Sequence, residues 1–232
     1  MDLLTGTSGF AYKEWKGAFY PPDVQNDGML AYYAGRLGTV EINNTFYRMP
    51  KESVVAGWAD QVPDTFRFVL KAPQRITHFG RLVNVESELD YFLGVSNALG
   101  AKRGPTLFQL PPNMKADLDR LAAFTARLPR GWPAAFEFRH ASWFDDATYA
   151  LLRERHLALV AADTDDGDTP LEATTTWGYV RLRREAYTED QLVAWRRRLA
   201  ATGWERVSVF FKHEDAATGP LLAERFATIA LR

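Results

Sequence analysis

Val40-Glu41-Ile42-Asn43-Asn44 is a short apolar run that ends on polar residues at its C-terminal edge. The same arrangement recurs in six further runs, at residues 66–71, 107–109, 136–140, 159–163, 179–183 and 209–213, and an eighth candidate opens the chain at residues 3–8. Apolar runs of this length, separated by helical patterns, are typical of strands in an α/β protein. Eight of them predict a TIM-barrel-like (β/α)8 barrel, in which the active site collects at the C-terminal ends of the strands.

The segments between these runs predict the helices of the barrel. Helical patterns cover residues 27–36, 51–61, a segment ending at Leu99, 115–128, 145–156, a segment beginning at Thr188, and 220–231. Thr188 is followed three residues later by Gln191, the pattern of a capping box. Residues 163–177 carry no helical pattern, so we expect the helix between the sixth and seventh strands to be missing or replaced by a loop. No linker or internal repeat is visible, and residues 1–232 are predicted to form one domain.

Composition narrows the class of function. The 28 Lys and Arg residues nearly balance the 29 Asp and Glu residues, which disfavours a non-specific polyanion binder. The chain has no cysteine, so thiolate nucleophiles and sulfur-ligated zinc are excluded. It shows neither a signal-peptide pattern nor an apolar run of about 20 residues that could span a bilayer. We therefore expect a cytoplasmic protein without a membrane partner, whose oligomeric state the sequence leaves open.

Alternation along the strands predicts which side chains face the barrel interior. Since the helix-facing positions of each run are apolar, the polar positions are assigned to the interior. The inward set is Glu41, Asn43, Lys71, Gln109, Glu137, Arg139, Asp163, Arg181 with Arg183 as a further candidate, and Lys212 or, one residue on, His213.

This inward set is rich in charge, and isolated buried charges are costly. Glu41 and Glu137 are candidates for acid–base catalysis, because their surroundings can tune a carboxyl pKa towards neutrality. The cations are candidates for holding a phosphate or carboxylate group. The alternative is a salt-bridge network that fills the barrel without chemistry.

Two histidines and several aromatic residues follow strand ends and extend the candidate site. His78 and His140 lie after the third and fifth strands, where they are suited to proton transfer or, equally, to a structural hydrogen bond. Tyr12, Trp15, Tyr47 and Trp143 are candidates for stacking against a substrate. Packing over the end of the barrel is their alternative role.

Motifs along nearly the whole chain resemble one known family. They are Gly6-Thr7-Ser8-Gly9, residues 40–47, Lys71-Ala72-Pro73, Ile76-Thr77-His78, residues 107–112 and Glu137-Phe138-Arg139-His140 with Ser142-Trp143. In this order they are similar to the family called domain of unknown function seventy-two, or YecE-like. The resemblance implies a TIM-barrel-like fold and no particular reaction. A distant likeness of such barrels to metal-dependent endonucleases is a fold-level analogy only. Residues 181–184 and 210–214 depart from the family's usual pattern at the last two strand ends.

The sequence leads to one functional hypothesis and two alternatives. The first is an enzyme that binds a small anionic, sugar-like, phosphorylated or carboxylated substrate and acts on it by acid–base chemistry. The second is a nucleic-acid binder or metal-dependent nuclease, and the third is a barrel that senses a ligand without turnover. No cofactor and no metal-ligand set are predicted, although the carboxylates allow magnesium or manganese as an alternative.

Overall fold

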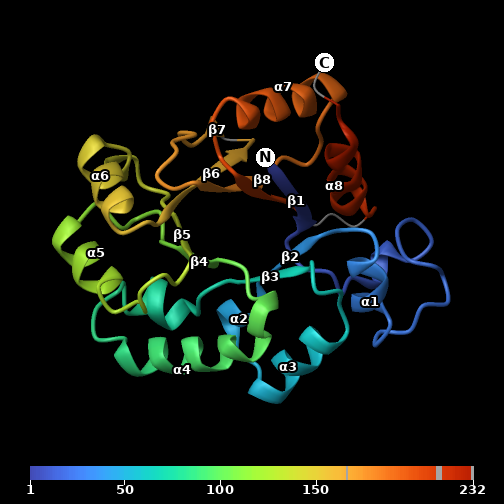
Figure 1. Ribbon diagram of the computed structural model, residues 1–232, viewed down its shortest axis with the longest axis horizontal. Coiled ribbons are helices and arrows are strands. Elements are labelled where there is room, and N and C mark those ends of the chain that lie inside the picture. The colour runs from blue at the N-terminus through green and yellow to red at the C-terminus, as the bar shows by residue number, and fades with distance from the viewer. Residues whose placement is uncertain (166, 213–215, 231–232) are drawn as a thin grey trace.

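The computed structural model describes residues 1–165, 167–212 and 216–230. The strands are β1 (Asp2–Thr7), β2 (Thr39–Ile42), β3 (Arg67–Leu70), β4 (Thr106–Gln109), β5 (Ala134–Glu137), β6 (Ala158–Thr164), β7 (Gly167–Asp168), β8 (Trp177–Leu182) and β9 (Arg206–Phe211). The α-helices are α1 (Met29–Ala34), α2 (Asn44–Tyr47), α3 (Glu52–Asp60), α4 (Glu86–Ser96), α5 (Leu118–Thr125), α6 (Asp146–Glu154), α7 (Glu189–Ala200) and α8 (Thr218–Thr228). Short helical turns of other types lie at Lys13–Trp15, Arg75–Phe79, Asn97–Lys102 and Ala141–Trp143. The strands lie in the middle of the molecule and most of the helices surround them (Figure 1).

Nearly all strand pairs are parallel. One sheet has the order β1-β9-β8-β6-β5-β4, with the short β7 antiparallel to β6, and β2 and β3 form a separate parallel pair. An isolated bridge joins Ser8, just after β1, to Glu41 of β2, and a second joins Lys71, just after β3, to Leu107 of β4. The predicted α/β class with parallel strands is therefore confirmed. In the described residues, the β2–β3 pair is joined to β1 and to β4 by single bridges and not by continuous strand pairing.

The two faces of the strands pack into different parts of the core. On one side lies an apolar cluster, which we call the inner cluster, and this side is the inner face of the strands. The inner cluster consists of Val69, Leu107, Ala135, Ala158, Val160, Tyr179 and Phe210. Alternate residues such as Phe68, Phe108 and Phe136 belong instead to the larger cluster that includes the helices. A polar side chain on the inner face must lie at a strand end to avoid this apolar cluster.

The predicted helices are present, with shorter bounds than the sequence patterns suggest. The capping box of α7 is confirmed: Thr188 N donates to Gln191 Oε1 at 2.9 Å, and Gln191 N donates to Thr188 Oγ1 at 3.3 Å. Between β6 and β8, the described residues contain the short strand β7 and loops but no helix, as expected from the Asp-, Thr- and Gly-rich sequence.

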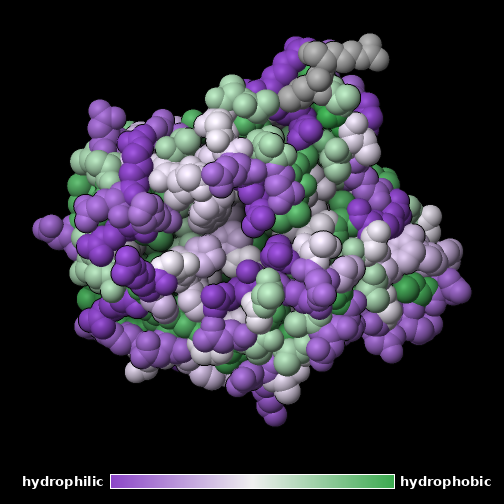
Figure 2. Space-filling view, in the orientation of Figure 1, coloured by the Kyte–Doolittle hydropathy of each residue, from purple (hydrophilic) through white to green (hydrophobic). Residues whose placement is uncertain are grey.

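The surface mixes hydrophilic and hydrophobic residues. On the face shown in Figure 2, hydrophobic residues occur in small groups separated by hydrophilic ones. In the part of the chain that the structure describes, no helix combines the length and the apolar content that crossing a bilayer would require.

Gly6 sets how closely β1 can approach β2. A Cβ atom built at Gly6 would lie 1.9 Å from the carbonyl oxygen of Thr39, which is backbone and cannot swing aside. The absence of a side chain at Gly6 therefore allows the contact between the two sheets at this junction.

We expect Gly6→Ala to lower the free energy of unfolding by about 2 kcal/mol or more, because the two strands would have to separate. Gly57→Ala in α3 is the matched control, since nothing lies within 4 Å of the added methyl group. It is expected to raise the stability by up to about 1 kcal/mol through helix propensity. Urea unfolding of both variants checks this, and equal changes in the two would contradict the role of Gly6.

Candidate functional site

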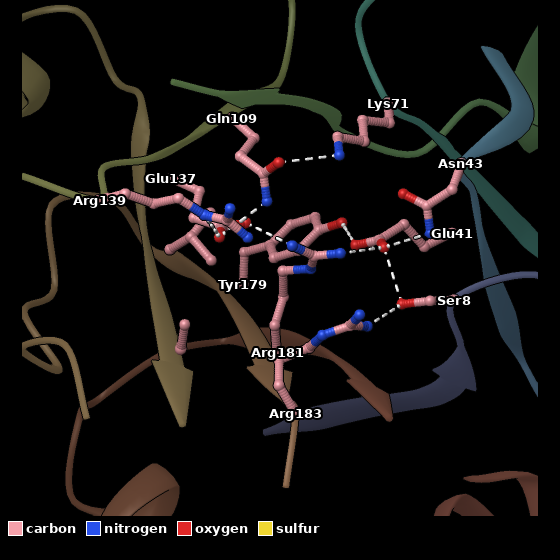
Figure 3. A network of polar contacts seen from close by, with 12 residues as sticks. Ser8, Glu41, Asn43, Lys71, Gln109, Glu137, Arg139, Tyr179, Arg181 and Arg183 are labelled. Atoms are coloured by element: carbon pink, nitrogen blue, oxygen red, sulfur yellow. Dashed lines mark hydrogen bonds and ion pairs between the residues drawn. The ribbon is translucent and has the colours of Figure 1, made fainter. Parts of the chain in front are cut away.

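A buried arginine joins two buried carboxylates at the C-terminal ends of the strands. Arg181 Nη2 donates to Glu41 Oε1 at 2.8 Å, and Arg181 Nη1 donates to Glu137 Oε2 at 2.6 Å. Arg181 is 3% exposed, Glu41 0% and Glu137 4%. These side chains come from β8, β2 and β5, so the arginine connects strands of both sheets (Figure 3).

Glu41 is surrounded by donors. Its Oε1 accepts from Ser8 Oγ at 2.9 Å and from Asn43 Nδ2 at 3.0 Å, besides Arg181. Its Oε2 accepts from the Tyr179 hydroxyl at 2.6 Å. Burial alone would raise the pKa of Glu41, but the nearby arginines and the donated hydrogen bonds lower it to about 2. Glu41 is therefore a fixed negative charge at neutral pH.

Glu137 begins a chain of contacts that ends at a lysine. Its Oε1 accepts from Gln109 Nε2 at 2.9 Å and from Arg139 Nε at 3.3 Å. The other end of the Gln109 amide, Oε1, accepts from Lys71 Nζ at 2.9 Å. Although burial opposes ionisation, Arg181 and Arg139 hold the pKa of Glu137 below its usual value. Glu137 thus fixes both the amide of Gln109 and, through it, the amine of Lys71.

A polar pocket of about 330 Å³ opens above these carboxylates. It is lined by Tyr12, Asn43, Asn44, Tyr47, Lys71, Gln109, Arg139, Arg181 and Arg183. Arg183 Nη1 donates to Ser8 Oγ at 2.7 Å, and burial together with the nearby Arg181 lowers the pKa of Arg183 to about 10. The cations that line this pocket therefore repel one another.

Lys71 has unusual surroundings within the pocket. Its Nζ lies 4.0 Å from the centre of the Phe46 ring, and the same ring contacts His78 edge-on, with 4.9 Å between ring centres. Burial and Arg181 lower the pKa of Lys71 to about 8, against the opposing effect of the two glutamates. Burial and the Lys71 ammonium likewise lower the pKa of His78.

Strand alternation brings together most of the residues predicted to face inward. Glu41, Asn43, Lys71, Gln109, Glu137, Arg139 and Arg181 form one connected group with Arg183 (Figure 3). Sequence reasoning missed Tyr179 and gave Ser8 only a weak role. Tyr179 lies two residues before Arg181 on β8, so the same alternation placed it on the inner face. Its aromatic character suggested core packing instead.

The prediction for Asp163 was wrong. Its carboxylate accepts from Arg184 Nε at 2.5 Å and from Trp195 Nε1 of α7 at 2.9 Å, so it faces the helix layer. Val160 of β6 belongs to the inner cluster, and alternation then puts Asp163 on the opposite face. Alternation cannot assign the two faces of β6, because the strand is apolar on both of them.

Two of the predicted aromatic residues lie away from the pocket, whereas two line it. Trp15 and Trp143 are fully buried. Trp143 stacks on Phe138 with 4.5 Å between ring centres and donates its Nε1 hydrogen to the carbonyl oxygen of Met114. Their placement at the mouth was wrong, because rings of this size bury most of their area in the core. Tyr12 and Tyr47 do line the pocket.

The remaining predicted residues lie outside the connected group. His140 accepts from Ser142 N at 3.1 Å and caps the turn Ala141–Trp143, which is the structural alternative considered for it. Lys212 is half-buried after β9 and is not among the residues that line the pocket. Phe210 of β9, two residues before Lys212, belongs to the inner cluster. The alternative candidate His213 lies outside the described residues.

The carboxylates of the site are poorly arranged for a metal. Within residues 1–165, 167–212 and 216–230, no group of three or more His, Cys, Asp or Glu residues is placed to hold an ion. The oxygens of Glu41 and Glu137 already accept hydrogen bonds from arginine, amide and hydroxyl groups. The magnesium or manganese alternative therefore stays a prediction without a ligand set of its own.

A second cavity of about 300 Å³ lies at the opposite, N-terminal ends of the strands. Its arginines are occupied: Arg67 donates to backbone carbonyls, Arg103 stacks over Trp132 and Arg206 pairs with Asp2. Ligands of parallel α/β proteins bind at the C-terminal ends of strands, so this cavity is the weaker candidate.

Comparison with known proteins identifies the family. The model of the family described as Protein of unknown function DUF72 matches residues 4–231. The chain belongs to this family. It is similar to the UPF0759 protein YecE of Escherichia coli strain K12, with 34% identity over 116 residues, 50% of this chain and 43% of that protein. It is also similar to the UPF0759 protein YunF of Bacillus subtilis strain 168, with 27% identity over 140 residues, 57% of this chain and 50% of that protein. The aligned stretches thus span about half the length of these two relatives.

Crystal structures of the family agree with the fold. A DUF72 family protein from Thermotoga maritima MSB8 superposes with a TM-score of 0.86 and 25% identity, covering 98% of both chains. A DUF72 family protein from Enterococcus faecalis V583 gives a TM-score of 0.81 with 18% identity, covering 99% of this chain and 97% of that one. These likenesses establish an α/β fold shared with DUF72 proteins.

We expect Arg181→Met to lower the free energy of unfolding by roughly 3–5 kcal/mol, because it leaves two carboxylates buried without their partner. Arg206→Met is the control, since Arg206 and Asp2 form a pair whose side chains are about half exposed. Its expected change is within about 1 kcal/mol. Equilibrium urea unfolding compares the two. Similar losses in both variants would show that Arg181 does not hold the site together.

Glu41 is expected to make the fold sensitive to acid. Its pKa is about 2 in the folded protein and 4.5 without those contacts, so between these values the unfolded chain binds more protons. The free energy of unfolding therefore falls as the pH drops from 4.5 towards 2, by on the order of 3 kcal/mol from this group.

Tyr179→Phe tests this acid sensitivity, because it removes a hydrogen bond to Glu41 and raises the folded pKa. The variant should be less stable at pH 7 and lose less on acidification. The control is Tyr20→Phe, which removes a buried hydroxyl that donates to the Phe10 carbonyl oxygen. Its free energy of unfolding should be lower than that of the unmodified protein by the same amount at every pH. Parallel pH profiles for all three proteins would contradict the assignment.

Proposed function

We propose that this chain is a single-domain, TIM-barrel-like cytoplasmic protein that binds a small anionic ligand in the pocket at the C-terminal ends of its strands. The ligand carries a phosphate or carboxylate group, and the protein acts on it as an enzyme. One observation carries the proposal: the pocket presents more positive charge than the carboxylates beneath it neutralise.

The charges of the site can be compared directly. Among the described residues, four cations line the pocket, namely Lys71, Arg139, Arg181 and Arg183, whereas the group beneath them contains two carboxylates, Glu41 and Glu137. Arg181 forms ion pairs with both carboxylates. The pocket is left with a positive excess. Burial and then repulsion from Arg181 lower the pKa values of Lys71 and Arg183, and a bound anion would offset that repulsion.

The size and lining of the pocket favour a small, polar ligand. A volume of about 330 Å³ lies at the lower end of the range for small-molecule sites, roughly 300–1,000 Å³. Arg139 and Arg183 offer guanidinium groups, which suit planar, paired hydrogen bonds to phosphate or carboxylate oxygens. Asn43 and Asn44 add amides that could bond the hydroxyl groups of a sugar-like substrate.

The two isolated bridges support a barrel. The bridges from Ser8 to Glu41 and from Lys71 to Leu107 join the β2–β3 pair to the larger sheet on both sides. Both bridges lie at the C-terminal ends of β1 and β3, beside the pocket. In a (β/α)8 barrel this end carries the active site.

The contacts of Glu41 and Glu137 support an anchoring role. Both are ionised, and their oxygens already accept hydrogen bonds, so each is a weak base and a poor proton donor. Their predicted role as acid–base catalysts stays a prediction. Among the groups that face the pocket, Lys71 has a pKa closer to neutrality and is better suited to exchange protons.

Calorimetric titration with inorganic phosphate at low ionic strength tests the proposal. We expect saturable binding that Arg183→Gln weakens at least tenfold, as loss of a charge-assisted hydrogen bond requires. Arg155→Gln is the control, because Arg155 directly follows α6, near the amino end of β6, and among the described residues its ion pair is with Glu154. Absence of phosphate binding, or equal weakening by both variants, would overturn the proposal.

A second candidate is binding of single-stranded nucleic acid. Tyr47 and Phe79 are 73% and 72% exposed, and Tyr47 lines both the anion pocket and a neighbouring pocket that contains Arg48 and Arg75. Exposed rings beside cations suit base stacking. Salt-sensitive binding of an oligonucleotide that Tyr47→Ala abolishes would favour this candidate over the small ligand.

A further inference from the structure

Lys71 differs from an ordinary buried lysine in what surrounds its amine. It is 9% exposed, and its Nζ donates to the neutral amide of Gln109 and lies over the face of the Phe46 ring. In the described part of the chain it has no carboxylate within ion-pair distance. An ammonium group has three hydrogens to donate, and the pocket side of this one is open.

Lys102 shows how the same chain treats a structural lysine. Its Nζ donates to the carbonyl oxygens of Ala59 and Val62 and lies 3.4 Å from Asp64 Oδ1. Its amine therefore has two hydrogen-bond acceptors and one carboxylate beside it. Lys71, by contrast, is held in position by one amide and one ring, and its remaining hydrogens are left for a ligand.

We propose that Lys71 is a catalytic residue that forms a Schiff base with the carbonyl carbon of an anionic aldehyde or ketone, whose phosphate or carboxylate group is held by Arg139 and Arg183. This inference rests on the proposed anion pocket and names the class of its substrate.

The covalent step balances without any further reactant. The neutral amine of Lys71 adds its nitrogen lone pair to the carbonyl carbon. A carbon–nitrogen bond forms, and the carbonyl oxygen leaves as water with the two amine hydrogens. One proton from solvent then makes the imine a cationic iminium, which withdraws electrons from the neighbouring carbon of the substrate. No oxidant or reductant takes part.

The surroundings of Lys71 favour its neutral, nucleophilic form. Arg181 and Arg139 oppose its charge, whereas Glu41 and Glu137 support it, and His78 contacts the same Phe46 ring edge-on. With burial added, the pKa of Lys71 falls to about 8. The neutral fraction at pH 7 is then about one in ten, compared with about one in three thousand for an ordinary lysine.

Borohydride trapping tests the inference. The protein is incubated with dihydroxyacetone phosphate or with pyruvate, reduced with sodium borohydride, and mapped by peptide mass spectrometry. Hydride addition to the iminium carbon gives a stable secondary amine. We expect Lys71 to carry at least ten times more adduct than any other lysine with one of the two anionic probes. Neutral dihydroxyacetone should label it at least tenfold less, and inorganic phosphate should compete.

Variants separate chemistry from folding. Lys71→Met and Lys71→Arg should lose the label, and the arginine variant keeps the positive charge if the methionine variant fails to fold. Lys115→Met is the control, because Lys115 is exposed in the loop after β4. In this variant the labelling of Lys71 should be unchanged.

The outcomes distinguish this inference from the proposed function. If phosphate binds but neither anionic probe labels Lys71 selectively, the Schiff base is wrong and the anion site stands. If phosphate does not bind and Lys71 is not labelled, both are wrong. Labelling spread evenly over surface lysines also overturns the inference.

Discussion

The site depends on Arg181 and the two carboxylates that it joins. Although burial opposes its charge, Glu137 and Glu41 raise the pKa of this arginine, and its guanidinium in turn keeps both carboxylates ionised. Removing Arg181 would leave both buried carboxylates without the partner that they share. Because they come from β8, β2 and β5, the same contacts that neutralise the charges also fix the relative positions of the two sheets.

A second group of side chains lies between these three buried charges and the pocket. Asn43 and Gln109 connect the two groups, since each donates to a glutamate below and also lines the pocket above. The upper cations have few protein acceptors: Arg183 donates to the hydroxyl of Ser8 and Lys71 to the amide of Gln109. The lower group holds the buried charges in contact with one another, and the upper group gives the pocket its excess of positive charge.

Most of the inward-facing residues could be predicted from the sequence, because a strand with one polar and one apolar face has only one orientation that buries the apolar face against the helices. Glu41 between Val40 and Ile42, and Glu137 between Phe136 and Phe138, are such cases. The reasoning failed for Asp163, where β6 is apolar on both faces and buried on both. It also missed the hydroxyl of Tyr179, which binds Glu41 while the ring packs in the inner cluster. Which charges pair depends on distances between strands. Alternation along one strand gives the face on which a residue lies and says nothing of those distances.

The division of the site into two groups has a consequence for substitutions at its arginines. Both Arg139 and Arg183 line the pocket, but Arg139 also donates to the buried Glu137, whereas Arg183 donates to the hydroxyl of Ser8. A replacement of Arg183 therefore changes the charge of the pocket and leaves the buried pairs of Arg181 with Glu41 and Glu137 in place.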